Sequence, residues 1–121
     1  MKKLGLKSRL VVYVLLYLVH NYLASGFSLL NCGVSFSLLP NLAMIVSVLW
    51  LFVVVVYYHK HRMIAVELVL LGGCINFIDR LIFGGVRDYW EIFNSGIYNN
   101  LADYVIFVGL IYFYVELKKD D

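Results

Sequence analysis

The feature that most constrains this chain is a long stretch without charge. From Leu10 to His59, 50 consecutive residues include no Asp, Glu, Lys or Arg. One straight helix of that length, at ~1.5 Å per residue, would overshoot the ~30 Å hydrocarbon core of a bilayer more than twofold. The stretch must therefore fold back on itself, and the sequence predicts a small protein that crosses a membrane several times.

The rest of the chain is also too apolar for a soluble domain. Of its 121 residues, 63% are hydrophobic and 15% are charged, whereas soluble domains carry ~25% charged residues. We predict an all-α membrane protein with four transmembrane helices and a small extracytoplasmic β-strand segment. A single integral membrane domain would cover residues 1–121, with spans at roughly 10–27, 42–58, 63–83 and 101–117. Each span has a length that crosses a bilayer.

The basic residues predict the orientation of these spans. Most of the Lys and Arg fall before the first span, after the second, and at the carboxyl end of the chain. The positive-inside rule puts these clusters, and both termini, in the cytoplasm. Residues 28–39 and 84–100 are then extracytoplasmic, and the alternation at residues 34–37 predicts a strand-like piece in the first. Three separate clusters also argue against binding of nucleic acid, which favours one continuous basic patch.

The polar side chains of the second half fall in two groups. These are Asn76, Asp79, Arg80 and Asp88 in one group, and Asn100 and Asp103 in the other. Ionisable residues at the margin of a hydrocarbon layer are costly to keep, so by default they indicate a functional site. The expected topology puts all of them near the extracytoplasmic face.

Asp88 and Asp103 are two carboxylates that a short surface segment can bring together. Two carboxylates in one partly dry pocket do not both ionise easily, so one keeps its proton. The ionised acid can take a proton from water while the protonated acid polarises a carbonyl. The pair predicts peptide hydrolysis of the aspartic type, which needs no cofactor, and the Cys and His spacing indicates no metal site.

Structural roles compete with chemistry for the other polar residues. Asp79 is better explained as one half of an ion pair, with Arg80 or with Arg87, that closes the outer end of the bundle. Asn76 suits a hydrogen-bonding strut between helices. Asn100 suits the N-cap of the last helix.

Two residues of the membrane spans also have structural explanations. Glu67 lies about one turn into the third span, and we expect it to reach the cytoplasmic surface or to pair with Lys60 or Arg62. A role of Glu67 in proton relay is the minority interpretation. His20 is expected to be a packed or hydrogen-bonded residue of the first span.

Four motifs, in chain order, resemble those of signal peptidase II, the lipoprotein signal peptidase family. Asn31–Ser37 is similar to the family's N-x-G-x-A-F-S, and Asn76–Arg80 to its N-x-x-D-R. Val86–Tyr89 is similar to its V-x-D-F/Y, and the stretch from Asn100 to Gly109 to its N-x-A-D-x-x-I-x-x-G. Each motif alone is weak, but four in the family's order make a specific resemblance.

The resemblance implies a membrane-embedded aspartic endopeptidase of the bacterial cytoplasmic membrane. The roles it implies are catalysis by Asp88 and Asp103, support of the site by Asn76, Asp79, Arg80 and Asn100, and substrate contact by Asn31. The substrate would be a diacylglyceryl-modified prolipoprotein, cut just before its lipidated Cys. The expected partners are this substrate and membrane phospholipid, with no cofactor and no nucleic acid, and the chain is expected to act as a monomer.

The chain departs from the family pattern in its first half. Family members usually carry an Asp and, four residues on, a Lys near the outer end of the first span, and the matching stretch, Tyr17 to Asn21, holds no charge. Two alternatives stay open: a four-span transporter that uses Glu67, and a catalytically inactive member that only binds lipidated peptides. A transporter is disfavoured because its key charge is expected near mid-membrane, whereas most of these acids lie toward the outer edge.

Overall fold

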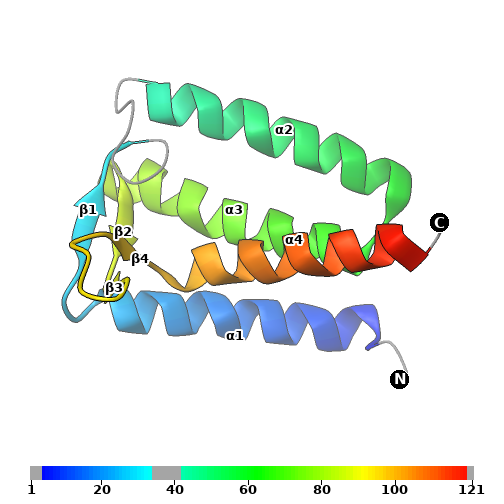
Figure 1. The fold of residues 1–121 in the computed structure, drawn as a ribbon, viewed down its shortest axis with the longest axis horizontal. Helices are drawn as coiled ribbons and strands as arrows, with labels where there is room; N and C mark the ends of the chain where they lie inside the picture. The colour runs from blue at the N-terminus through cyan, green and yellow to red at the C-terminus, as the bar shows by residue number, and fades with distance from the viewer. Residues whose placement is uncertain (1–3, 34–41, 120–121) are drawn as a thin grey trace.

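The computed structural model describes residues 4–33 and 42–119, which form four helices and four short strands (Figure 1). The elements are α1 (Leu6–Ala24), β1 (Leu29–Asn31), α2 (Ala43–His61), α3 (Ile64–Phe83), β2 (Val86–Asp88), β3 (Trp90–Glu91), β4 (Tyr98–Asn99) and α4 (Leu101–Lys119). The helices run alongside one another, and the strands gather at one end of the bundle. The beginning of α1 and the end of α4 lie at the opposite end.

The helices coincide with the four predicted spans, but their ends differ. α1 begins earlier than the predicted 10–27, and it also ends earlier, because a turn at residues 25–26 leads the chain into β1. α2 continues to His61, beyond the predicted 42–58. Arg62 ends it in the left-handed conformation (φ 49°), and its N–H donates to the carbonyl oxygen of Tyr58 at 2.8 Å.

The apolar character of the helices is less uniform than the sequence suggested. Within the described ranges, α2 is the single helix that is long and apolar enough, by length and composition, to cross a membrane. α3 and α4 carry acidic and basic residues along their length, and α1 has polar residues at both ends. Four helices are present as predicted, but composition alone identifies just one of them as a span.

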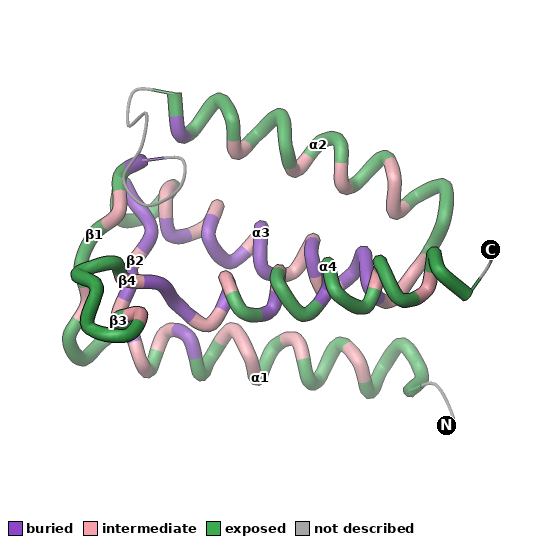
Figure 2. Tube along the Cα trace, viewed as in Figure 1, coloured by how far each residue is buried: buried purple, intermediate pink, exposed green. Residues whose placement is uncertain are grey.

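α3 is the central helix of the bundle. Its buried residues run from Ala65 to Asp79, whereas α1 and α2 are exposed along most of their length (Figure 2). α3 and α4 pack closely, since a side chain at Gly72 would collide with α4 and one at Gly109 would collide with α3. Small residues at a helix interface allow such close approach.

The outward faces of the helices expose many large apolar side chains. Val11, Leu49 and Phe107, on three different helices, are each more than half exposed. Soluble monomers rarely expose a continuous apolar surface of this extent. The outer surface of the bundle is therefore suited to hydrocarbon rather than water.

Two small antiparallel sheets cover one end of the bundle. In the first, β1 pairs with β2 in the register Leu29–Asp88, Leu30–Arg87 and Asn31–Val86. In the second, β3 and β4 form a hairpin with Trp90 opposite Asn99 and Glu91 opposite Tyr98. A strand segment at this end agrees with the prediction, but the stretch for which it was predicted, residues 34–37, lies outside the described residues.

Candidate active site

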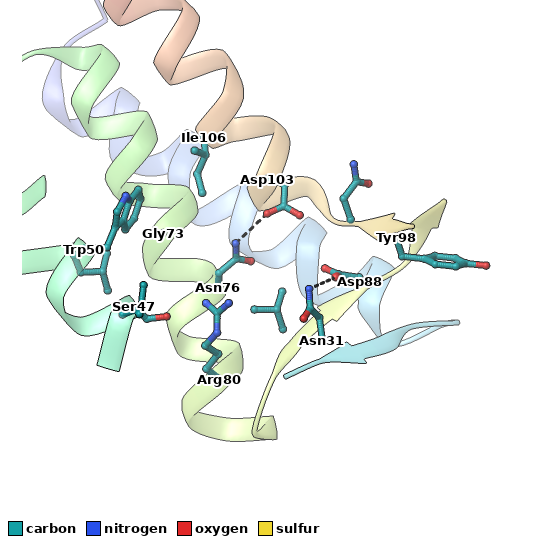
Figure 3. A pocket seen from close by; sticks show the side chains of 14 residues that line it. Asn31, Ser47, Trp50, Gly73, Asn76, Arg80, Asp88, Tyr98, Asp103 and Ile106 are labelled. Atoms are coloured by element: carbon teal, nitrogen blue, oxygen red, sulfur yellow. Dashed lines mark hydrogen bonds between the residues drawn. The ribbon is translucent and has the colours of Figure 1, made fainter. Parts of the chain in front are cut away.

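A cavity of about 360 Å³ opens between α2, α3, the start of α4 and the strands (Figure 3). Its polar lining residues are Asn31, Ser47, Asn76, Arg80, Tyr98, Asn99, Asp88 and Asp103. The lining includes five of the seven residues that the sequence analysis assigned to a site. Asn100 is fully buried just behind this lining, and Asp79 is buried away from the cavity.

Asp88 and Asp103 reach this cavity from separate elements. Asp88 is the last residue of β2, and Asp103 lies in the first turn of α4. The expected convergence of the two acids at the strand end of the bundle is therefore present in the structure.

Asn100 is hydrogen-bonded to both acids. Its Nδ2 donates to Asp88 Oδ1 at 2.9 Å, and its backbone N–H donates to Asp103 Oδ2 at 3.1 Å. Its Oδ1 accepts from the backbone N–H of Asp103 at 3.0 Å, which completes a reciprocal capping arrangement at the start of α4. The capping interpretation of Asn100 is therefore confirmed, and the same residue contacts both acids of the cavity.

Asn76 and Asn31 each donate to one of the acids. Asn76 Nδ2 donates to Asp103 Oδ1 at 3.2 Å, and its Oδ1 accepts from Asn100 Nδ2 at 3.1 Å. Asn76 is therefore the strut between α3 and α4 that the sequence predicted. Asn31, at the end of β1, donates from Nδ2 to Asp88 Oδ2 at 3.2 Å. The contact with Asp88 was not anticipated, since substrate contact was the role expected of Asn31.

Burial raises the pKa of Asp88 from 3.8 to about 6, and the nearby negative charge of Asp103 adds to the rise. The hydrogen bonds from Asn31 and Asn100 act in the opposite direction. Two coupled acids of this kind titrate as a pair that holds one proton over an intermediate pH range. The repulsion between the two carboxylates acts on both of them, so the single proton belongs to the pair of Asp88 and Asp103.

Arg80 lines the cavity from α3 and brings a positive charge close to both acids. Its Nη2 donates to the carbonyl oxygen of Gly33 at 3.0 Å, which connects α3 to the segment after β1. In the described part of the chain, no three His, Cys, Asp or Glu side chains lie together in a group that could hold a metal ion.

Asp79 is a structural acid rather than a cavity residue. Its Oδ1 lies 2.9 Å from Arg87 Nη2, and its Oδ2 accepts from the Arg87 backbone N–H at 3.1 Å. Of the two ion-pair partners that the sequence allowed, Arg87 is the one that the structure gives. Asp79 therefore supports the site indirectly, by holding the strand that carries Asp88.

Two residues of α1 lie near the site. His20 is confirmed as a packed and hydrogen-bonded residue of the first span, but its contact with Asp79 was not foreseen, and Asn21 was missed. His20 is fully buried, with Nε2 3.0 Å from Asp79 Oδ2. The side-chain oxygen of Asn21 accepts from Arg87 Nη2 at 2.6 Å. Their position at the outer end of the first helix, level with Asp79, was a signal that could have identified them.

Glu67 lies at the other end of α3, and the prediction that it pairs with Lys60 or Arg62 is wrong. Arg9 donates to both of its oxygens, from Nε at 3.0 Å and from Nη2 at 3.1 Å. The hydroxyls of Tyr13 and Tyr58 donate to Glu67 Oε1 and Oε2, each at 2.6 Å. Three helices therefore meet at this carboxylate. Sequence spacing could not predict the contacts from α1, because they depend on how α1 packs beside α3.

Comparison with known families identifies a relationship over nearly the whole chain. The profile of the family described as signal peptidase (SPase) II matches residues 3–118. A lipoprotein signal peptidase of Streptococcus agalactiae is 34% identical over 102 residues, which cover 75% of this chain and 66% of that protein. The chain thus matches just under two thirds of the length of that relative. A lipoprotein signal peptidase of Staphylococcus aureus is 23% identical and covers 98% of this chain and 74% of its own length.

Two solved structures share the fold. One, described as a bacterial membrane enzyme determined by the in meso method at 2.3 Å resolution, gives a TM-score of 0.76 at 22% identity, with coverage of 98% of this chain and 92% of the other. A second, of the same description at 1.9 Å resolution, gives a TM-score of 0.74 at 21% identity, with coverage of 99% and 98%. The helical bundle with its small strands is therefore an established architecture.

Proposed function

The chain belongs to the signal peptidase II family, and on this premise we propose that it is a membrane-embedded aspartic endopeptidase that removes signal peptides from diacylglyceryl-modified prolipoproteins. The observation that most directly supports this proposal is the shared cavity of Asp88 and Asp103, with Asn100 hydrogen-bonded to both. The relatives in Streptococcus agalactiae and Staphylococcus aureus carry the name lipoprotein signal peptidase.

The two acids have complementary roles in this proposal. Ionised Asp103 takes a proton from a water molecule, whose oxygen then attacks the carbonyl carbon of the bond before the lipidated Cys. Asp88 gives its proton to the carbonyl oxygen, so the tetrahedral intermediate is neutral. As that intermediate collapses, the C–N bond breaks and the amine of the new N-terminal Cys leaves with a proton returned by Asp103. One hydroxyl group of the intermediate returns its proton to Asp88 as the new carboxyl group forms, so the pair again holds a single proton for the next cycle.

The side chains around the acids favour this division. Asn31 and Asn100 donate to Asp88 and orient its carboxyl group, while burial and the charge of Asp103 favour its protonated form. Arg80 contributes a positive charge that stabilises the ionised member of the pair. We therefore propose Asn31 and Asn100 as residues that orient Asp88, and Arg80 as the residue whose charge favours one ionised acid in the pair.

We further propose that all four helices cross the bilayer with both termini in the cytoplasm. The basic clusters at the start of α1, the end of α2 and the end of α4 lie at one end of the bundle, opposite the strands. The positive-inside rule puts that end in the cytoplasm and the cavity toward the extracytoplasmic face. A substrate that remains in the bilayer would reach the acids beside α2, whose Ser47 and Trp50 line the cavity.

The proposed partners are the lipidated prolipoprotein and the surrounding phospholipid. A single chain carries both acids and all of their hydrogen-bond donors described above, so the proposed active unit is a monomer. A transporter that uses Glu67 receives no support, because that carboxylate is held by Arg9, Tyr13 and Tyr58.

Cleavage of a lipidated substrate by the purified wild-type protein tests the proposal. A diacylglyceryl-modified prolipoprotein should be cut before its lipidated Cys. A matched substrate with that Cys replaced by Ala, which carries no lipid, should remain intact. Binding of the lipidated substrate without cleavage would replace the proposal by a lipopeptide-binding role, and neither binding nor cleavage would reject both.

A further inference from the structure

His20 is a fully buried residue of α1 that no step of the proposed hydrolysis uses. Its two ring nitrogens contact different elements. Nε2 lies 3.0 Å from Asp79 Oδ2 on α3, and Nδ1 lies 2.9 Å from the hydroxyl of Tyr89, the residue after β2. The imidazole therefore connects α1 to α3 and to the residue that follows Asp88 of the cavity.

The chemistry of the partners gives each of these hydrogen bonds a direction. Asp79 is ion-paired with Arg87, and an ionised carboxylate only accepts, so the proton of the ring is on Nε2. In the neutral imidazole Nδ1 is then an acceptor, and the Tyr89 hydroxyl donates to it. The oxygen of Tyr89 in turn accepts from the backbone N–H of Leu101 at 3.0 Å.

The result is a hydrogen-bond chain in which every donor points the same way. It runs from Leu101 to Tyr89, from Tyr89 to His20, and from His20 to Asp79. We name this set of four residues the His20 chain. Protonation of the ring would make both nitrogens donors, and the hydroxyl of Tyr89 would then have to turn away.

The His20 chain holds the segments next to both acids. Tyr89 directly follows Asp88, and Arg87 directly precedes it. Asp79 accepts from the backbone N–H of Arg87. Leu101 is the first residue of α4, the helix that carries Asp103 in its first turn. One end of the His20 chain thus fixes the start of α4, and the other fixes the strand of Asp88.

We propose that His20, neutral and with its proton on Nε2, is a positioning residue that sets the separation of Asp88 and Asp103. Its effect on cleavage rests on the proposed function, whereas its tautomer and its link to Tyr89 do not. The stretch of α1 around His20 carries no charged residue, so a neutral ring and the Asn21 amide make the contacts of α1 with Asp79 and Arg87.

The tautomer can be tested without any activity. The chain has three His, so a variant with His59→Gln and His61→Gln leaves His20 as the only imidazole. Ring-¹⁵N NMR of this variant in detergent at pH 8 should show the neutral Nε2–H tautomer. Tyr89→Phe should then shift the Nδ1 resonance, because the hydrogen-bond donor to that nitrogen is lost. An Nδ1–H tautomer, or an Nδ1 resonance that ignores Tyr89→Phe, would overturn the inference.

The positioning role is tested by kinetics on the lipidated substrate. His20→Ala should lower kcat by about tenfold or more, because a small misplacement of reacting groups is costly, and KM should change less than kcat. His20→Gln, which keeps a donor toward Asp79, should recover part of the loss. Exposed His59 provides the matched control, and His59→Gln should leave kcat unchanged.

A double mutant separates positioning from simple loss of packing. Tyr89→Phe breaks the same chain without changing the ring, so its loss in kcat should not add to that of His20→Ala. Additive losses, or a change confined to KM, would contradict the inference. Tyr89→Phe carries the test if His20→Ala does not fold. If the wild type does not cleave the substrate, the proposed function fails, and the NMR result alone decides the state of His20.

Discussion

The bundle holds a buried acid at each end, and the two differ in what surrounds them. Glu67, at the end of the bundle opposite the strands, accepts four hydrogen bonds, two of them from the guanidinium of Arg9. Asp88, at the strand end, accepts from the neutral amides of Asn31 and Asn100 and faces a cavity that it shares with Asp103. Both acids are less than one tenth exposed.

The difference separates a structural acid from one that can do chemistry. A buried carboxylate with a fitting cation and a full set of donors is fixed in its ionised form, and removal of a partner is costly. A buried carboxylate with neutral donors and a second acid nearby keeps a proton that can be transferred near neutral pH. Asp79, paired with Arg87, belongs with Glu67 although it lies close to the cavity.

The largest expected effect is on cleavage when either acid of the cavity is changed. Asp88→Asn and Asp103→Asn should each lower kcat/KM by about a thousandfold or more, since neither amide can exchange a proton with water or substrate. Both variants should still accumulate as folded protein, measured by thermal unfolding in detergent. A normal cleavage rate in either variant would show that the two ends of the bundle do not differ in function.

The next effect is a change in activity with pH. Burial and Asp103 raise the pKa of Asp88 to about 6, so Asp88 keeps its proton below that pH and loses it above. In the free protein, kcat/KM should therefore fall about tenfold per pH unit above about pH 6, and it should also fall in acid as Asp103 becomes protonated. The alkaline limb of kcat should lie at higher pH, because bound substrate buries Asp88 further. A flat profile of kcat/KM from pH 5 to 8 would contradict the pair.

A smaller effect, on stability alone, is expected at the other end. Glu67→Gln should lower the free energy of unfolding by on the order of 2 kcal/mol, because hydrogen bonds to a charged group are lost and Arg9 is left without its carboxylate. The change should leave kcat within about twofold, since Glu67 lies far from the cavity along α3. Glu116, which pairs at the surface with exposed Lys119, is the matched control, and Glu116→Gln should lower the free energy of unfolding by less than about 1 kcal/mol. Equal losses of unfolding free energy in Glu67→Gln and Glu116→Gln would show that Glu67 is not a structural acid of the kind described.

The smallest effects are expected at the two tyrosines that donate to Glu67. We call Glu67 and its three donors, Arg9, Tyr13 and Tyr58, the Glu67 cluster. Tyr13→Phe and Tyr58→Phe each remove one hydrogen bond without changing the packed ring, and each should lower the free energy of unfolding by about 1 kcal/mol. Because both hydroxyls donate to the same carboxylate, the double variant should deviate from additivity. Strict additivity would indicate that the two sides of the cluster act independently. The measurement is thermal unfolding in detergent.

Much of the strand end could be predicted because its signals are local. Asn100 and Asp103 are three residues apart at a helix start, and Asn76 and Asp79 share one helix face, so their depth follows from the helix alone. The motif around Asp88 then supplies the second acid. Sequence spacing could not give the partners of Asp79 and Glu67, since Arg9 and His20 reach α3 only through the way α1 packs.

Composition was a weaker guide to the helices than motif order. The four helices are present, yet α3 carries Glu67, Asp79 and Arg80, and composition alone does not identify it as a span. Of these three residues, Arg80 lines the cavity, Asp79 holds the strand of Asp88 through Arg87, and Glu67 joins three helices at the other end. The polar residues of α3 therefore make the helix harder to identify as a membrane span from its composition.

Asn100 gives assembly of the bundle a direct consequence for activity. The side chain that starts α4 also orients Asp88, so a chain whose last helix has not formed has no paired acids. On the proposed function, a nascent or partly inserted molecule would have no peptidase activity. Activity would appear only once α4 has formed.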